Sequence, residues 1–331
     1  MSEPRPMTAA ELRAKMRLPL FGSPLFIISN PKLVIAQCKA GVVGSFPALN
    51  ARPQSLLDEW LHRIKEELAA HDRRHPDRPS APFAVNLIVH KSNDRLEADA
   101  ATCLKHKVPL LITSLGARED IYTTFAKSGT LVFHDIINIT FARKALEKGA
   151  GGLVAVCAGA GGHAGRLSPF GLIQEIREFY DGPLALSGAI AHGGSILAAE
   201  ALGADFAYAG SMFIAASEAN AVEGYKADIV AGTADGIVYT NLFTGVHGNY
   251  LRSSIARAGL DPDNLPVSDP SKMNFGTNRP ARAWKDIWGS GQGIGAVKQI
   301  EPVAAMVERM EREYKAAKAA IARGARAPAG A

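Results

Sequence analysis

A glycine-rich segment near the middle of the chain has the residue types of a catalytic loop. The segment VAVCAGAGGHAGRLSPF begins at Val154 and holds several glycines around one histidine, His163. Glycine lets a backbone approach a flat ligand closely, and imidazole is the side chain of this loop that exchanges protons near neutral pH. Isolated histidines are often structural, but the glycines beside this one offer no side chains to pack against. We therefore predict that His163 is a catalytic base beside a bound cofactor.

Two later segments have the pattern of phosphate-binding loops. They are SGAIAHGG, from Ser187, and AGSMF, which contains Gly210 and Ser211. Each places glycine amides close to an expected helix start, where uncovered N–H groups and the helix dipole stabilise an anion without a lysine. We expect Gly188, Ala189, Gly210 and Ser211 to be the anchors. Ordinary turn glycines are the alternative interpretation of these loops.

The loop around His163 also fits a weak dinucleotide fingerprint. The pattern GxGxxA runs from Gly159 to Ala164. Five strand–helix units already precede it, whereas such fingerprints normally follow the first strand of a nucleotide-binding domain. The order of elements therefore favours a barrel over a Rossmann fold.

Short apolar runs alternate with helix-like stretches along most of the chain, which is the signature of βαβ units and a parallel sheet. Because the runs are apolar at consecutive positions, they suit strands that are buried on both faces. Eight such strands are expected, at 25–28, 41–46, 82–88, 108–113, 130–134, 151–156, 183–188 and 206–210. The predicted fold class is α/β, a (β/α)8 TIM barrel with an inserted lid or substrate subdomain after strand eight.

The segments between the strands have helical periodicity and helix stop signals. From Ser55, the residues Leu56, Trp60, Ile64 and Leu68 recur at four-residue spacing and predict one apolar stripe. Gly149 and Gly203 fall where helices should end before the next strand, because glycine tolerates the left-handed conformation that ends a helix.

The rhythm of strands and helices fails after the eighth strand. We expect residues 1–214 to form the barrel, 215–295 to be an inserted lid or substrate region, 296–325 to complete the barrel, and 326–331 to be a flexible tail. The insert contains VYTNLFTGVHGNYL, which mixes aromatic walls with polar tips as ligand sites do. Candidate substrate residues in it are Tyr239, His247, Asn249 and Tyr250, and core packing explains the aromatic ones equally well.

Composition and charge exclude several classes of protein. The 37 basic and 32 acidic residues are spread along the chain, so the net charge of +5 does not suggest a nucleic-acid partner. Three cysteines without metal-site spacing predict neither a metal centre nor a disulfide framework. The chain has no apolar run long enough to cross a bilayer and no signal-peptide pattern near its start. We expect a cytoplasmic enzyme without a membrane partner.

Three segments together carry a family resemblance. GAGGHAG, then PLALSGAIAHGG, then ALGADFAYAGSMFIA resemble the 2-nitropropane dioxygenases, now called nitronate monooxygenases, whose superfamily also holds enoyl-ACP reductase II and NADH:quinone reductases. Counterparts of PFAVN and of DIWGSGQGIGAVKQIEP occur in the same order, so the likeness covers most of the chain.

The resemblance implies non-covalently bound FMN and roles for individual residues. His163 would be the catalytic base, and Gly161 and Gly162 would line the isoalloxazine. Asn86 in PFAVN would reach the ring or the ribityl chain. The flavin phosphate would lie among the loop residues already named, with Gly291 and Gln292 approaching from the C-terminal side; the full cofactor set is Asn86, His134, Asp135, Gly161, Gly162, Ser187, Gly188, Ala189, Gly210, Ser211, Gly291 and Gln292.

The chain departs from its relatives after the fifth strand. Many relatives have a lysine where this chain has Asp135, so the flavin environment loses a cation. A cation near the pyrimidine side of a flavin stabilises the anionic reduced form, and we expect His134 to take that part, with Asp135 raising its basicity. Ala189 stands where relatives have the second of two glycines. Ser211 stands for a threonine and keeps the hydroxyl.

The predicted activity is oxidation of alkyl nitronates, or of nitroalkanes, with O2 to a carbonyl compound and nitrite. The alternative is an NAD(P)H-dependent FMN reductase of quinones or enoyl thioesters, in which the inserted region forms the nicotinamide or substrate site. A flavin-binding protein without turnover is the third interpretation. The expected partners are a small-molecule substrate and O2, and a homodimer is left open.

Overall fold

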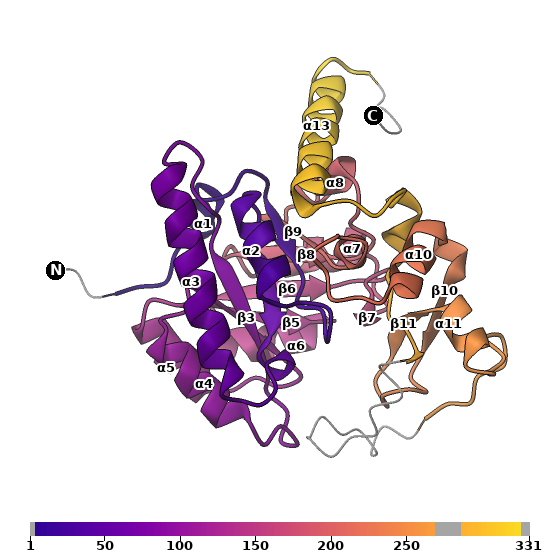
Figure 1. Ribbon diagram of the computed structural model, residues 1–331, viewed down its shortest axis with the longest axis horizontal. Coiled ribbons are helices and arrows are strands. Elements are labelled where there is room, and N and C mark those ends of the chain that lie inside the picture. Colours follow the sequence, from indigo (N-terminus) through magenta and orange to yellow (C-terminus); the bar gives the residue numbers. More distant parts are fainter. Residues whose placement is uncertain (1–3, 269–285, 326–331) are drawn as a thin grey trace.

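The computed structural model describes residues 4–268 and 286–325, and a parallel sheet of eight strands lies at its centre (Figure 1). The strands are β1 (Leu20–Gly22), β2 (Gly44–Pro47), β3 (Phe83–Ile88), β4 (Leu110–Ser114), β5 (Leu131–Ile136), β6 (Gly152–Val156), β8 (Leu184–Ser187) and β9 (Phe206–Ala209). They are hydrogen-bonded in the order β1-β9-β8-β6-β5-β4-β3-β2. A parallel bridge between Phe21 and Val43 joins the two outer strands, so the sheet closes into a barrel.

Alternate side chains of the strands fill the inside of the barrel. Phe21 lies at the centre, with its ring centroid 5.3 Å from those of both Phe133 and Phe206 in edge-on contacts. Leu12 and Met16, on and just after helix α1 (Ala9–Arg13), belong to the same buried cluster and cover the N-terminal end of the barrel. The interior is therefore a packed core, and polar side chains can enter it only near the carboxyl ends of the strands.

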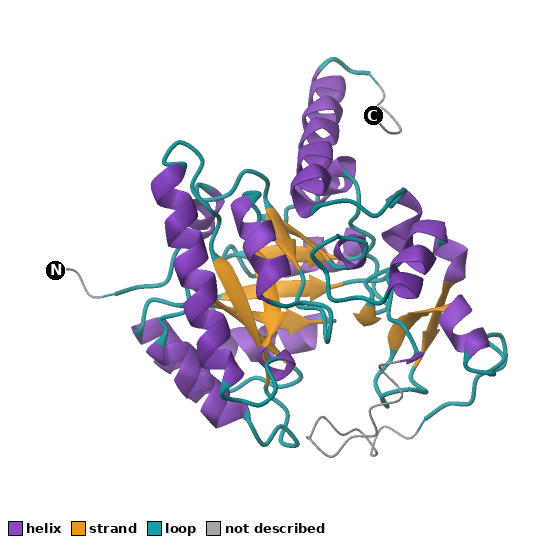
Figure 2. Cartoon of the chain, in the orientation of Figure 1, coloured by secondary structure: helices purple, strands orange, loops and turns teal. Residues whose placement is uncertain are grey.

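Helices cover the outside of the barrel (Figure 2). They are α2 (Pro31–Lys39), α3 (Leu56–Arg74), α4 (Leu96–Lys105), α5 (Glu119–Lys127), α6 (Ile139–Glu147), α7 (Pro169–Arg177), α8 (Gly193–Ala201) and α13 (Val303–Ala322). The buried face of α3 carries Leu57, Leu61, Ile64 and Leu68, whereas Leu56 and Trp60 of the predicted stripe are only partly buried beside it. The (β/α)8 barrel predicted from the alternation of elements is confirmed.

The prediction for the first strand is wrong. Residues 25–28 form a turn, and the strand is the three-residue β1 that precedes it. Ile27 has a φ of 68° and is 43% exposed. The Asn50 side chain accepts from the Ile27 N–H at 2.9 Å and donates to the Leu25 carbonyl at 3.0 Å. The apolar run resembles a buried strand, but hydrophobicity alone does not show which residues pair with a neighbouring strand.

The segment after the eighth barrel strand forms a second, smaller sheet with a piece of the barrel. Here β10 (Ile237–Thr240) pairs antiparallel with β11 (Gly248–Leu251), and β11 pairs antiparallel with β7 (Gly162–His163), which belongs to the loop after β6. In Figure 1, β7 lies between the barrel and β11. The short elements around this sheet are α9 (Ser211–Ile214), α10 (Glu223–Ala231), η2 (Ala234–Gly236), α11 (Arg252–Arg257) and η4 (Gln292–Ala296), and η1 (Ala48–Asn50) follows β2. The division at 214 and 295 stays a prediction, and 269–285 and the tail 326–331 lie outside the described residues.

Glycines end helices where the sequence predicted them. Gly149 and Gly203 follow α6 and α8 with φ values of 94° and 104°. The helix α13 packs against α8 and α2 and completes the outer ring. Among the described helices, none is long and apolar enough to span a bilayer.

The contact between α8 and α13 depends on Gly193. A Cβ at this position would lie 2.2 Å from the Met310 carbonyl oxygen and 2.3 Å from the Tyr314 amide nitrogen. Gly193→Ala is therefore expected to lower the free energy of unfolding by about 1–3 kcal/mol, as overpacking does. Gly171→Ala is the matched control, because a Cβ on Gly171 in α7 meets nothing within 4 Å. It should stabilise the protein by up to about 1 kcal/mol through helix propensity. Urea unfolding measures both, and equal stabilities would contradict the close packing.

Candidate active site

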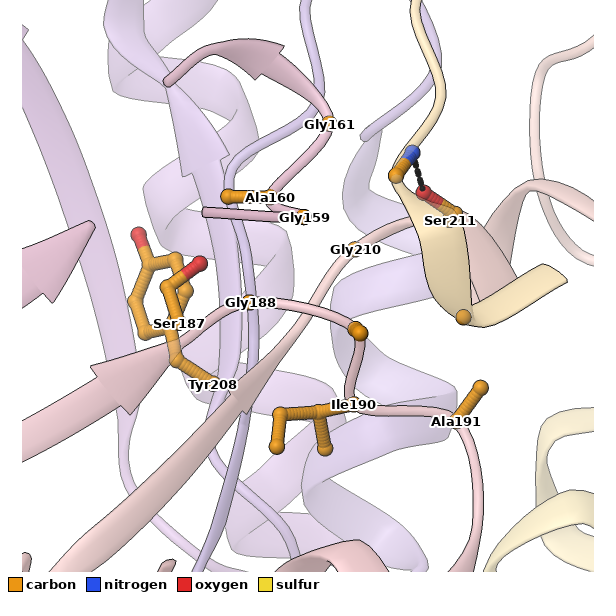
Figure 3. Close-up of a pocket in the computed structure, with 13 residues that line it drawn as sticks. Gly159, Ala160, Gly161, Ser187, Gly188, Ile190, Ala191, Tyr208, Gly210 and Ser211 are labelled. Atoms are coloured by element: carbon orange, nitrogen blue, oxygen red, sulfur yellow. Dashed lines mark hydrogen bonds between the residues drawn. The ribbon is translucent and has the colours of Figure 1, made fainter. Parts of the chain in front are cut away.

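A pocket lies at the carboxyl ends of the barrel strands, where the loops after β6, β8 and β9 meet (Figure 3). It is narrow and partly open to solvent. Its lining is mostly backbone and small side chains: Gly159, Ala160, Gly161, Ser187, Gly188, Ala189, Ile190, Ala191, Tyr208, Gly210, Ser211, Gly291 and Gly293. The structure thus brings the predicted phosphate anchors together with one side of the histidine loop.

The loops at this pocket approach each other so closely that only glycine fits. A Cβ on Gly161 would lie 2.7 Å from the Gly291 nitrogen and 3.0 Å from Ser211 Oγ, and a Cβ on Gly291 would lie 2.5 Å from the Gly159 carbonyl oxygen. The Gly291 N–H donates to Ser211 Oγ at 2.7 Å, as Figure 3 shows. The segment from Gly289 to Gly293, distant in sequence, is therefore fastened to the pocket.

Ala189 keeps a backbone conformation that favours glycine. Its φ is 54°, it follows Gly188 with a φ of 148°, and its N–H donates to the Gly159 carbonyl at 3.2 Å. A non-glycine residue in the left-handed region costs about 1 kcal/mol or more. The sharp turn after β8 is thus retained, although one of its glycines is replaced.

The start of α8 does not offer its first amides to a phosphate. The Gly193 N–H donates to the Glu313 carboxylate at 2.7 Å, and the Gly194 N–H donates to His192 Nδ1 at 2.9 Å. His192 is therefore a helix cap. At α8 the expectation that the helix start binds the anion needs correction, because the pocket is lined by the turn at 188–191, before the helix begins. At α9 the pocket does reach the helix start, through the N-cap Gly210 and the first residue Ser211.

His163 has more neighbours than the sequence indicated. Its strand β7 pairs with Gly248 of β11, and the Ala164 N–H donates to the His247 carbonyl at 3.2 Å. The imidazole is half-buried, and its Nε2 lies 3.1 Å from Thr244 Oγ1. The glycine loop is thus a short strand that holds the imidazole in place beside the inserted segment.

The four candidate substrate residues have different surroundings. Tyr239 and His247 stack with centroids 5.0 Å apart, and the Tyr239 hydroxyl donates to the Ala164 carbonyl at 3.1 Å, so both rings lie beside the strand of His163. Asn249 is buried and donates to the Ala160 carbonyl at 2.7 Å, which fastens the loop. Tyr250 is 0% exposed and belongs to a small core, which favours the core-packing interpretation of this ring. Its position on β11 puts its ring on the inner face of the insert.

A chain of polar side chains crosses the barrel mouth. Asn86 Nδ2 donates to Ser114 Oγ at 2.8 Å, and the Ser114 hydroxyl donates to Asp135 Oδ2 at 2.5 Å. All three side chains occupy strand positions that face the barrel interior. Two residues earlier on the same strands as Ser114 and Asp135, Ile112 and Phe133 belong to the interior core. Asp135 Oδ1 is buried and has no hydrogen-bond partner among the described residues. Burial raises the pKa of Asp135 to about 7, against the lowering effect of the Ser114 hydrogen bond.

His134 does not supply the cation that was expected of it. Its side chain faces the helices, where Nδ1 lies 2.8 Å from Thr113 Oγ1 and 3.0 Å from the Tyr122 hydroxyl oxygen. Burial lowers the pKa of His134 to about 4, so the ring is neutral at pH 7. The prediction is wrong because successive residues of a strand point to opposite faces, and Asp135 takes the inward position.

Sequence reasoning missed three residues of this site. Ser114 links Asn86 to Asp135, Tyr208 lines the pocket, and Thr244 contacts His163. Strand parity carries a signal for Ser114 and Tyr208, since both occupy inward positions near strand ends. No sequence pattern pairs Thr244 with His163, because they are 81 residues apart.

The raised pKa of Asp135 predicts a pH-dependent stability. The carboxyl has a pKa of about 7 in the folded protein, against an ordinary pKa of 3.8 for an exposed aspartate. Folding therefore favours the protonated form, and this stability is lost as the pH rises from about 4 through 7. Asp135→Asn should remove the loss, which amounts to at most about 1.4 kcal/mol for each pH unit in that window.

Urea unfolding of the apoprotein at pH 5, 6, 7 and 8 measures this difference. The advantage of Asp135→Asn over the wild type should grow up to pH 7 and then level off. Asp181→Asn, a change at an exposed carboxylate, is the control and should follow the wild type. Parallel wild-type and Asp135→Asn curves would mean that the Asp135 carboxyl titrates normally.

Comparisons with known proteins agree on one family. The family described as Nitronate monooxygenase matches residues 93–313. A nitronate monooxygenase from Paraburkholderia phytofirmans is 27% identical, with 90% of this chain and 92% of the relative covered. A nitronate monooxygenase from Neurospora crassa is 25% identical, with 89% of each covered.

Solved structures of similar fold cover nearly the whole chain. The nitroalkane oxidase of Streptomyces ansochromogenes superposes with a TM-score of 0.78 at 23% identity, over 94% of this chain and 99% of that one. FabK from Thermotoga maritima gives 0.75 at 22% identity, over 96% and 99%. These likenesses support the barrel, and the family match covers well over half of the residues. The chain belongs to the nitronate monooxygenase family and is, with it, a flavin-dependent oxidoreductase.

Proposed function

We propose that this chain is an FMN-dependent nitronate monooxygenase that oxidises alkyl nitronates with O2 to a carbonyl compound and nitrite. One observation carries the proposal. The residues Gly159–Gly161 form a wall of the pocket, and the next two residues form the strand that holds His163. A side chain that exchanges protons near neutral pH is thereby fixed next to a backbone-lined pocket, which would suit an anion.

The residues present fit FMN. The pocket follows the last two barrel strands, where barrels commonly hold a phosphate. Four glycines of its lining are positions at which a Cβ would collide with backbone: Gly161, Gly188, Gly291 and Gly293. Gly188, Gly210 and Ser211 would hold the phosphate. Ala189, whose N–H is bonded to the Gly159 carbonyl, and Ser187 would shape the turn beside it. When bound, FMN takes up electrons from the substrate and passes them to O2.

Other residues would surround the rest of the cofactor. Gly161 and Gly162 would lie along the ring, and Gly291 and Gln292 would cover it from the segment fastened to Ser211. Asn86 and Asp135 would present polar atoms from the barrel mouth, where the buried Asp135 Oδ1 is available to a ligand. The described lining of the pocket contains backbone, hydroxyl and apolar groups, so the anion would be held without a lysine or arginine there.

The role of His163 follows from its charge states. As a neutral base it would take the proton from the carbon next to a nitro group, and as a cation it would bind an anionic nitronate. Tyr239 and His247 would form a flat wall beside it, since their rings stack and the Tyr239 hydroxyl is tied to Ala164. The half-buried position keeps the imidazole reachable by a small substrate.

The first experiment is O2 uptake and nitrite release by the purified holoenzyme with propyl-2-nitronate, without nicotinamide. His163→Ala should lose about 10²–10⁴-fold in kcat/KM with neutral 2-nitropropane, the usual contribution of a general base, and less with the nitronate. His62→Ala, at an exposed histidine on α3, is the control and should keep wild-type rates. An absence of uptake, together with bleaching of the flavin by NADH or NADPH under argon, would replace this proposal by an FMN reductase.

The fit of FMN has its own test in Gly161→Ala. The added Cβ would press on the Gly291 nitrogen and on the Ser290 carbonyl carbon, 2.7 and 2.9 Å away. A displaced 289–293 segment should weaken FMN binding by about tenfold or more, measured by fluorescence titration of apoprotein with FMN. Gly171→Ala is the matched glycine control. Unchanged FMN affinity in Gly161→Ala would place the cofactor elsewhere.

A further inference from the structure

Thr244 makes three short contacts through one hydroxyl oxygen. Its Oγ1 lies 3.1 Å from His163 Nε2, 3.0 Å from the Val246 carbonyl oxygen and 3.2 Å from the Val246 amide nitrogen. The side chain is 5% exposed, so water does not compete freely for these contacts. The donor and acceptor roles in this cluster can therefore be assigned from the groups themselves.

The Thr244 hydroxyl can donate one hydrogen bond, and the chemistry of its partners determines which of them accepts it. The Val246 carbonyl can only accept, so the Thr244 hydroxyl must donate to it. The Val246 N–H can only donate, so it gives its proton to Thr244 Oγ1. The remaining acceptor capacity of Oγ1 then meets His163 Nε2, which must carry a hydrogen if all three contacts are hydrogen bonds. In the neutral ring, the lone pair is then on Nδ1.

The turn that carries Thr244 is fixed from both ends. It connects β10 to β11, and the Gly245 N–H donates to the Asn241 carbonyl at 2.9 Å. Gly245 has a φ of 77°, a conformation that glycine adopts without strain. Four residues after Thr244, Gly248 pairs with His163 across the sheet. Sheet pairing and turn therefore place the hydroxyl opposite the imidazole before any substrate binds.

We propose that Thr244 is a positioning residue that sets the tautomer of His163, so that Nδ1 is the nitrogen that exchanges the substrate proton. This inference rests on the proposed function of His163 and adds which of its two nitrogens acts. The Nε2–H···Oγ1 bond is made by the neutral ring and by the imidazolium, and it is stronger in the cation because the donor is then charged. Thr244 therefore supports proton uptake at Nδ1 without giving or taking a proton itself.

The direct test is ¹⁵N NMR of the holoenzyme labelled at histidine, above the pKa of His163 and without substrate. His163→Gln identifies the two ring resonances by their disappearance. In the wild type we expect the ring hydrogen on Nε2 and none on Nδ1. In Thr244→Val both nitrogens should shift toward values averaged between the two tautomers, and Thr244→Ser should restore the wild-type pattern. A wild-type ring with the hydrogen on Nδ1 would overturn the inference, even if Thr244→Val did not fold.

Kinetics supply the second readout. Thr244→Val should lower kcat/KM for 2-nitropropane by roughly tenfold, the scale of one hydrogen bond, and should move the ionisation of the base in the pH profile to lower pH. Thr244→Ser should recover both values. Unchanged profiles in Thr244→Val would count against the positioning role. The NMR result does not depend on turnover, so failure of nitronate oxidation and failure of this inference are distinguishable.

Discussion

The close approach of the glycine loop after β6 to the inserted segment is the constraint on which the site depends. Gly161 and Gly291 touch backbone to backbone, and Gly162–His163 joins the sheet of β11. A side chain at either glycine would separate the segments. The Tyr225 hydroxyl on α10 donates to the Gly289 carbonyl and holds the other side of the same segment. This one contact region thus forms the wall of the pocket and fixes the orientation of the His163 imidazole.

The electrostatics at the barrel mouth follow from strand parity. The inward position after β5 is a carboxyl, Asp135, whose pKa of about 7 leaves acid and carboxylate both populated near neutral pH. The neighbouring imidazole, His134, is turned toward α5 and is neutral. Within the described part of the chain, a ligand at this mouth therefore meets hydrogen-bonding groups, one of them titratable near neutral pH, rather than a fixed cation.

The sequence predicted the barrel better than it predicted the side-chain network. Seven of the eight strands lie where the apolar runs are, and Gly149 and Gly203 end their helices as expected, because burial and backbone conformation leave local marks. The first strand was predicted a few residues too late in the sequence. Only its pairing with β9, through residues distant in sequence, distinguishes it from the apolar turn that follows. The contact between Thr244 and His163 also joins residues that are distant in sequence, so no local pattern predicts it. Contacts set by the register of strands far apart in the chain cannot be seen in a local pattern.

The inserted segment and the loop of His163 complete each other's hydrogen bonding. The described core of the insert is small, with Tyr250, Ile255 and Ile287 at its centre. A two-stranded hairpin with so few buried side chains is marginal alone, and the third strand comes from the barrel. The loop of His163 in turn obtains its backbone partners from Gly248 and Asn249. The fold of the insert and the position of His163 are therefore coupled through one sheet, so sequence changes in the insert must preserve the register that holds His163.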